Sequence, residues 1–211
     1  YLGKPIKESE FVISYFQKYL DKIHKLIGKD LQLPTWKKYN YACIQIVGFI
    51  KWKYKKKDIP LDKINLQFLT EFEYYLKTEQ NQCQSTINKA IQRFRKLIKI
   101  AIAEGFLDKD PFMLYKPRKV KKEIIFLTHE ELTTVEKTSI SQPRLSLVKD
   151  LFIFCCYTGL AYNEMAHLEK QNIQIGFDGI NWIQMKREKT QRQISIPILP
   201  KAQEIIEEYS T

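Results

Sequence analysis

Glycine and proline are scarce in this sequence, with 7 and 8 of 211 residues. Together with 44% hydrophobic residues, this scarcity excludes collagen-like and disordered chains and leaves enough apolar material for packed cores. No apolar run approaches the roughly 18 residues of a membrane-spanning helix, and no signal-peptide pattern opens the chain. We therefore expect a folded cytoplasmic protein that does not enter membranes and has one large or two small domains.

Cysteine and histidine are also too few and too scattered for a metal site or a disulfide framework. The four cysteines, at positions 43, 83, 155 and 156, have no Cys-x-x-Cys spacing, and the three histidines lie far apart. We expect reduced, mostly buried thiols, no metal and no cofactor. The sequence also has no glycine-rich phosphate loop, no paired-carboxylate site and no persuasive catalytic triad.

Positive charge, by contrast, is abundant and unevenly distributed. Residues 1–126 hold 26 basic and 13 acidic side chains, a net charge of 26 − 13 = +13, whereas residues 127–211 hold 9 and 11, or −2. A field of this sign attracts polyanions, and double-stranded DNA is the commonest such partner. A membrane surface is disfavoured because the charge is dispersed over several elements.

The first part of the chain predicts four amphipathic helices. They are expected at residues 8–27, from Thr35 as N-cap to about Lys53, after Asn65 as N-cap, and from Ser85 or Thr86 as N-cap to Gly105. Their inward positions include Phe11 and Leu26 in the first helix and Val47 in the second. We expect a helical domain over residues 1–113, followed by an exposed basic linker over 114–126.

The second part, residues 127–211, predicts an α+β arrangement. A Thr-x-x-Glu capping box at Thr128 starts a short helix, a longer apolar helix covers residues 145–157, and a short one covers 162–168. Alternating apolar residues around 182–185 and 194–198 predict two strands joined near 187–192, and Pro200 starts a last helix. The fold class is therefore mainly α with a small β-hairpin or sheet.

The fourth helix has the clearest candidate DNA-binding surface. Its basic residues recur at spacings of three and four, so one face is cationic and the opposite stripe apolar. A similar polar surface opens the second helix, and residues 51–57, Lys-Trp-Lys-Tyr-Lys-Lys-Lys, alternate cations with aromatics that can stack on bases. The candidate DNA-binding residues of these helices are Lys37, Lys38, Thr86, Asn88, Lys89, Arg93 and Lys96.

Two motifs in the second part resemble the tyrosine recombinase (phage integrase) family, most closely the branch carried by conjugative and mobilizable transposons. The first is Thr-Gly-Leu-Ala-Tyr-Asn-Glu-Met at residues 158–165, and the second is Lys-Arg-Glu-Lys-Thr at 186–190, leading to Ile-Ser-Ile-Pro at 194–197. The resemblance implies a four-helix, SAM-like core-binding domain followed by the N-terminal part of an α+β catalytic domain. It also implies a homo-tetramer on double-stranded DNA for the full-length protein.

The resemblance further implies DNA cleavage and rejoining through a phosphotyrosine intermediate, without metal or nucleotide. Lys189 would be the general acid for the leaving 5′-oxygen, Glu164 would support the site, and Arg187 and Arg192 would contact phosphates. Two departures stand out. Ala161 occupies the position of the family's first catalytic arginine, and the motifs that hold the later catalytic residues and the nucleophile would lie beyond Thr211.

Three functional interpretations remain open from the sequence. The leading one is the recombinase or integrase of a mobile element, present here as a fragment that binds DNA without cleaving it. The second is a non-catalytic DNA-binding or architectural protein that reuses the fold, which the alanine at position 161 favours. The third is a basic helical interaction module, which predicts little salt dependence in any binding, whereas phosphate contacts predict a steep one.

Overall fold

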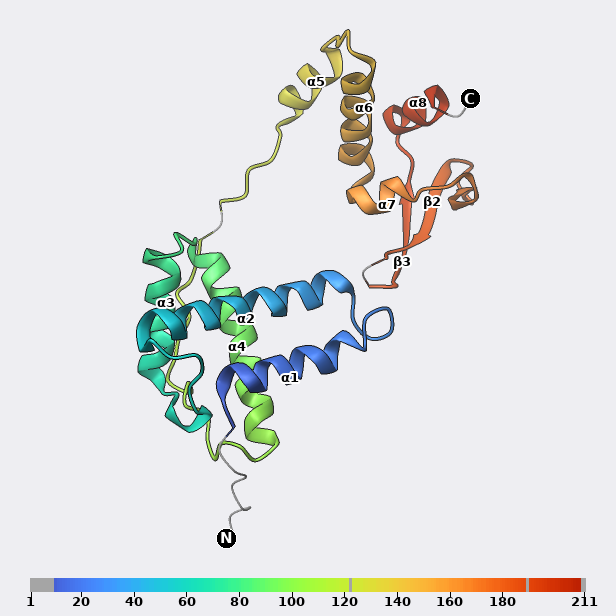
Figure 1. The fold of residues 1–211 in the computed structure, drawn as a ribbon. Coiled ribbons are helices and arrows are strands. Elements are labelled where there is room, and N and C mark those ends of the chain that lie inside the picture. Colours follow the sequence, from blue (N-terminus) through green and yellow to red (C-terminus); the bar gives the residue numbers. More distant parts are fainter. Residues whose placement is uncertain (1–9, 122, 189, 210–211) are drawn as a thin grey trace. The chain divides into compact units, whose positions relative to one another are not determined.

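The protein is described by a computed structural model covering residues 10–121, 123–188 and 190–209 (Figure 1). Its contacts divide the chain into a first unit, residues 1–122, and a second unit, residues 123–211. The predicted fold class, mainly α with a small sheet, is confirmed. No helix of the described residues is long and apolar enough to cross a bilayer.

The first unit is built from four helices, as predicted. They are α1 (Val12–His24), α2 (Leu33–Tyr54), α3 (Leu66–Thr78) and α4 (Gln84–Ala103), with a 3-10 turn, η1 (Leu61–Lys63), before α3. Helix α1 packs beside α2, while α4 packs on both α2 and α3 (Figure 1). Helix α1 is shorter than predicted, and the inward positions proposed for Phe11 and Leu26 are wrong, because both side chains lie outside the helix and are exposed.

An aromatic core holds the four helices together. Its largest fully buried side chains come from every helix and from the segment after α4, and Phe49 of α2 contacts the rings of Phe68 and Phe72 of α3. Burying each such side chain contributes about 1.5–3 kcal/mol. These phenylalanines are Phe16, Phe49, Phe68, Phe72, Phe94 and Phe112.

One of the N-caps predicted for the first unit is confirmed, and the other two are wrong. The Asn65 carboxamide accepts a hydrogen bond from the Phe68 amide at 2.9 Å, which confirms it as the α3 cap. Caps at Thr35 and at Ser85 or Thr86 are wrong, because α2 begins at Leu33 and α4 at Gln84. Pro34 in the first turn of α2 already has the required φ, so this start needs no side-chain cap.

The segment after α4 begins as part of the core rather than as an exposed linker. Phe112 and Tyr115 are buried, and the Tyr115 hydroxyl donates to Glu73 Oε2 of α3 at 2.7 Å. Residues 116–121 are exposed, as predicted. Two aromatic residues three positions apart fix the start of this segment, whereas residues 116–121 are mostly basic and their one large apolar side chain, Val120, is 43% exposed.

The second unit combines four helices with one small sheet. They are α5 (His129–Lys137), α6 (Pro143–Thr158), α7 (Tyr162–Ala166) and α8 (Pro200–Glu208), with a 3-10 turn, η2 (Lys170–Asn172), after α7. The Thr128 capping box of α5 is confirmed, and Pro200 lies in the first turn of α8. Ile153, Ile183 and Ile205 share its core.

The sheet has three antiparallel strands, one more than the sequence predicts. Strand β2 (Asn181–Lys186) pairs with β3 (Gln193–Pro197) and, along its other edge, with β1 (Ile173–Ile175). Ile183 opposes Ile196 in this register and is fully buried. The hairpin between β2 and β3 therefore places Arg187 and Arg192 at one end of the sheet.

The prediction of mostly buried thiols is wrong. All four cysteines are free, but only Cys43 is buried, while Cys83 and Cys156 are exposed. On the apolar helix α6, Phe152 is 46% exposed while Ile153 and Phe154 are buried.

Candidate nucleic-acid interface and catalytic residues

Helix α4 turns its basic residues outward, as its periodicity requires. Lys89 and Lys96 are exposed and Arg93 is half-buried, while Ile87 and Phe94 point into the core. One long side of this helix is therefore cationic over about 10 Å, given a rise of 1.5 Å per residue.

The first turns of α2 join this surface. Lys37 and Lys38 are exposed there, and the Lys96 ammonium lies 5.5 Å from the centre of the Tyr39 ring. Hydrogen bonding to the Tyr39 hydroxyl raises the pKa of Lys96, so this ammonium keeps its charge. We call the surface formed by Lys37, Lys38, Lys89, Arg93 and Lys96 the cationic face.

The start of α4 is also tied to the segment that follows the helix. The Asn88 carboxamide donates to the Arg118 carbonyl oxygen at 2.8 Å, so this donor is engaged within the first unit. Thr86 is exposed. The side-chain carboxamide of Gln82 donates to the Tyr41 hydroxyl at 3.2 Å, which ties α2 to the loop before α4. Lys96 therefore lies beside the first turns of α2, where Lys37 and Lys38 are exposed, while Thr86 and Asn88 lie in the first turns of α4.

Sequence reasoning missed three apolar side chains on α2. Tyr41, Ile44 and Val47 are 52%, 58% and 38% exposed, and they occupy the helix face between Lys37 and Lys51. The inward position predicted for Val47 is therefore wrong. The available signal was the helical period itself, because Cys43, Ile46 and Ile50 already fill the buried side.

In the second unit, Glu164 and Arg187 form the clearest charged pair. Arg187 Nε lies 3.3 Å from Glu164 Oε1, and Glu164 Oε2 accepts a hydrogen bond from the Ala161 amide at 3.0 Å. The carboxylate is buried, whereas the Arg187 side chain is half-exposed and free to meet a ligand. The hairpin therefore brings a guanidinium to the carboxylate that binds the backbone of Ala161.

The other predicted residues of this site are less defined. Lys189 lies outside the described residues. Arg192 is exposed, and its carbonyl oxygen accepts from the Arg187 amide at 2.8 Å, which closes the hairpin. The described residues contain no cluster of three potential metal ligands.

Tyr209 does not have the properties of an activated nucleophile. Its hydroxyl donates to Asp150 Oδ2 at 2.8 Å, and this hydrogen bond to a carboxylate raises the pKa of Tyr209 to about 12. A raised pKa disfavours the phenolate form, which is the form that attacks phosphorus. Tyr209 is therefore a structural contact between α8 and α6.

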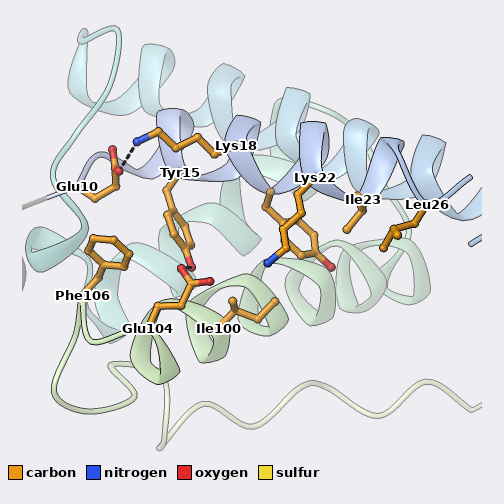
Figure 2. A pocket seen from close by; sticks show the side chains of 10 residues that line it. Glu10, Tyr15, Lys18, Lys22, Ile23, Leu26, Ile100, Glu104 and Phe106 are labelled. Carbon is orange, nitrogen blue, oxygen red and sulfur yellow. Dashed lines mark hydrogen bonds and ion pairs between the residues drawn. The ribbon is translucent and has the colours of Figure 1, made fainter. Parts of the chain in front are cut away.

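A hollow between α1 and α4 offers no second catalytic arrangement. Figure 2 shows the Tyr15 hydroxyl meeting Glu104, to which it donates at 2.8 Å, while Lys18 pairs with Glu10. Ile23, Leu26, Ile100 and Phe106 also line the hollow, which has a volume of about 290 Å³. Both of its carboxylates are engaged, and no other acid lines it.

Comparisons with known proteins agree on one architecture. Residues 11–122 match the family model described as the phage integrase SAM-like domain. No curated protein sequence matches the chain.

Several solved structures share the fold. A lambda integrase tetramer bound to a Holliday junction has a TM-score of 0.76 at 16% identity, and the match covers 97% of this chain and 57% of that one. The Tn1549 transposon integrase bound to transposon right end DNA scores 0.68 at 15% identity, with 94% and 64% covered. The XerH site-specific recombinase bound to a difH substrate scores 0.60 at 15% identity, with 92% and 56% covered. The chain thus spans little more than half the length of these structures.

Proposed function

The chain belongs to the phage integrase SAM-like domain family, and from this premise we propose that it is part of the site-specific tyrosine recombinase of a mobile element. The first unit binds duplex DNA, the second carries part of the catalytic site, and the complete protein acts in the cytoplasm as a tetramer on DNA. The observation that carries the proposal is the cationic face, where two helices present basic side chains to one ligand. Phosphate contacts by such side chains position a helix on DNA.

The proposed reaction is cleavage of a DNA strand by a tyrosine supplied from a segment outside residues 1–211. The tyrosine hydroxyl loses its proton to solvent, and its oxygen bonds to the scissile phosphorus. The bond from phosphorus to the 5′-oxygen breaks with its electron pair on that oxygen, which takes a proton from the Lys189 ammonium. Negative charge builds up on the phosphate oxygens during this exchange and must be neutralised. Since Ala161 has no charge, we assign this role to the Arg187 guanidinium, which Glu164 positions.

The DNA-binding part of the proposal is tested by charge reversal on α4. The Arg93→Glu/Lys96→Glu variant should bind a labelled duplex at least roughly tenfold more weakly and with a shallower salt dependence, because phosphate contacts release counterions. Lys25→Glu/Lys29→Glu is the matched control, with the same change in charge at exposed positions near the end of α1. Equal losses in both variants would show that only net charge matters.

The catalytic part is tested in the complete protein with a suicide substrate nicked beside the scissile phosphate. Lys189→Ala and Arg187→Ala should each lower the rate of covalent trapping by at least about 100-fold, whereas Arg187→Lys should retain part of the rate. Glu164→Gln should lower the rate less than Arg187→Ala does. Trapping at the normal rate in Arg187→Ala would refute the role of this arginine.

A non-catalytic DNA-binding or architectural protein remains the second candidate, because Ala161 removes a cation from the position where the family has one. This candidate predicts duplex binding that depends on the cationic face but no covalent complex with the complete wild-type protein. The suicide-substrate experiment therefore separates the two functions.

A further inference from the structure

The far end of α2 forms a basic hollow that the proposed function does not use. Its volume is about 850 Å³, within the range of sites that hold small molecules or single nucleotides. We call it the lysine pocket. Its lining residues are Val47, Gly48, Lys51, Trp52, Lys55, Lys56, Lys57 and Tyr75.

The four lysines of this pocket have no acidic partner among the described residues. The neighbouring acids are engaged elsewhere: Glu71 pairs with Lys53 at 3.0 Å, and Asp58 accepts from the Ile13 and Ser14 amides at the start of α1. The partial negative charge at the C-terminal end of α2 stabilises cations in the last turn of the helix. It does not explain Lys56 and Lys57, because both residues lie beyond that turn. Glu79 also lies near Tyr75, but no ion pair joins it to a described lysine of the pocket, so four lysines outnumber this one acid and the pocket has a net positive field.

Lys55, at the end of α2, has a backbone conformation that is unfavourable for a residue with a side chain. Its φ of 54° and ψ of 28° lie in the left-handed region, where a helix usually ends in glycine. A lysine held there costs conformational energy that glycine would avoid. The strain is consistent with a role for the Lys55 side chain.

The floor of the pocket is aromatic. The half-buried Trp52 ring lies 5.3 Å from the Tyr75 ring, and Phe49 packs behind Trp52 at 6.5 Å. Gly48 leaves room for this arrangement, because a Cβ at that position would come within 2.8 Å of the Tyr75 hydroxyl oxygen. The same hollow is thus lined by an indole ring and by four lysines. This combination matches a nucleotide, which has a flat base and an anionic phosphate.

We propose that the lysine pocket binds unpaired nucleotides of a DNA single strand, with phosphates at the lysines and one base against Trp52. A duplex is too wide to enter a hollow of this size, and its stacked bases have no free face for an indole. The site is separate from the cationic face, since Lys37 and Lys55 are 18 residues apart, or about 27 Å along α2. All residues of the lysine pocket belong to the first unit, so binding there does not depend on whether the protein cleaves DNA.

The experiment measures binding of a fluorescein-labelled dT12 oligonucleotide to the 211-residue chain by anisotropy. Replacing Lys51, Lys55, Lys56 and Lys57 with Gln should weaken binding at least tenfold, and up to about 2.8 should be lost from the slope of log K against log salt. The matched control replaces Lys25, Lys29, Lys63 and Lys109 with Gln. These lysines are also exposed and have the same total charge, and the control should bind dT12 less than threefold more weakly than the wild type.

Two further measurements decide the nature of the ligand. Trp52→Phe keeps an aromatic ring in the packing but removes the indole, so dT12 should no longer quench tryptophan fluorescence in this variant. Quenching that persists there would overturn the stacking role. If the four-lysine variant loses affinity for a 20-base-pair duplex as strongly as for dT12, or if the control variant loses as much, the pocket is no single-strand site and the proposal fails.

Discussion

Removing one hydroxyl group, in Tyr115→Phe, should destabilise the first unit measurably. That hydroxyl donates to Glu73 Oε2 at 2.7 Å, while Glu73 Oε1 accepts from the Gln84 carboxamide at 3.0 Å and lies 3.4 Å from Arg118 Nε. A hydrogen bond to a buried charged group contributes about 1.5–3 kcal/mol. Because Glu73 keeps its other two partners, we expect a loss of about 2 kcal/mol.

Urea unfolding measures this loss. In a Trp182→Phe background only Trp36 and Trp52 remain, and both lie in the first unit, so the fluorescence change reports that unit alone. With a slope of about 2 kcal/mol per molar urea, the midpoint should fall by about 1 M. Tyr74→Phe, at the exposed position next to Tyr75 on α3, is the matched control and should change stability by less than about 0.5 kcal/mol. A similarly small effect in Tyr115→Phe would refute the assigned role of the hydroxyl.

The same hydrogen bond predicts a pH dependence. Burial, followed by the bond to Glu73, raises the pKa of Tyr115. The folded state therefore keeps a proton that the unfolded state releases near pH 10, so this stabilisation is complete below pH 10 and falls as pH rises towards the folded pKa. The stability difference between wild type and Tyr115→Phe should accordingly shrink above pH 10. A difference that grows there would contradict the sign of this argument.

Three further predictions concern the surface of the first unit. Hydrogen bonds from neighbouring hydroxyls lower the pKa of the exposed Cys83 thiol to about 7, so the rate of its labelling by iodoacetamide should be half-maximal near pH 7. Burial raises the pKa of Cys156, so Cys156 should be labelled more slowly than Cys83. Equal labelling rates at pH 7 would contradict this prediction. Lys55→Gly should leave stability unchanged or raise it by up to about 1 kcal/mol in urea unfolding, because the left-handed backbone is easier for glycine. The exposed Ile44 side chain is expected to contact a thymine methyl group, so replacing thymine with uracil in a bound duplex should cost the wild type about fourfold per methyl in an anisotropy titration, and the Ile44→Ala variant much less.

The sequence predicted those parts of the fold that depend on contacts between residues close together in the chain. Asn65 and Thr128 each bind an amide three positions along, and such caps are visible in the sequence. The strand Ile173–Ile175 was missed because three residues have no useful period, and it exists only through its pairing with 181–183. Likewise, the buried Tyr115 hydroxyl donates a hydrogen bond to Glu73, which is 42 residues away in sequence, so spacing alone could not show this contact.

The candidate site was predictable to a similar extent. The cationic side of α4 follows from one helical period and lies where that period places it. The contact between Glu164 and Arg187 joins residues that are 23 positions apart through the hairpin, so spacing alone could not show it. The sequence shows Trp52 among the lysines of residues 51–57, but it could not show that the Tyr75 ring of α3 lies 5.3 Å from the Trp52 ring.

The charge distribution assigns binding and chemistry to different units. Residues 123–211 hold 9 basic and 12 acidic side chains, a net charge of 9 − 12 = −3, so the general field of the second unit does not attract DNA, and any phosphate it holds must be bound by local cations. Arg187 is such a cation, and the buried Glu164 fixes its orientation while neutralising part of its charge. Affinity for DNA should therefore depend on the first unit and decline steeply with salt, whereas substitutions at Arg187 should change the rate of reaction at a phosphate with little effect on affinity.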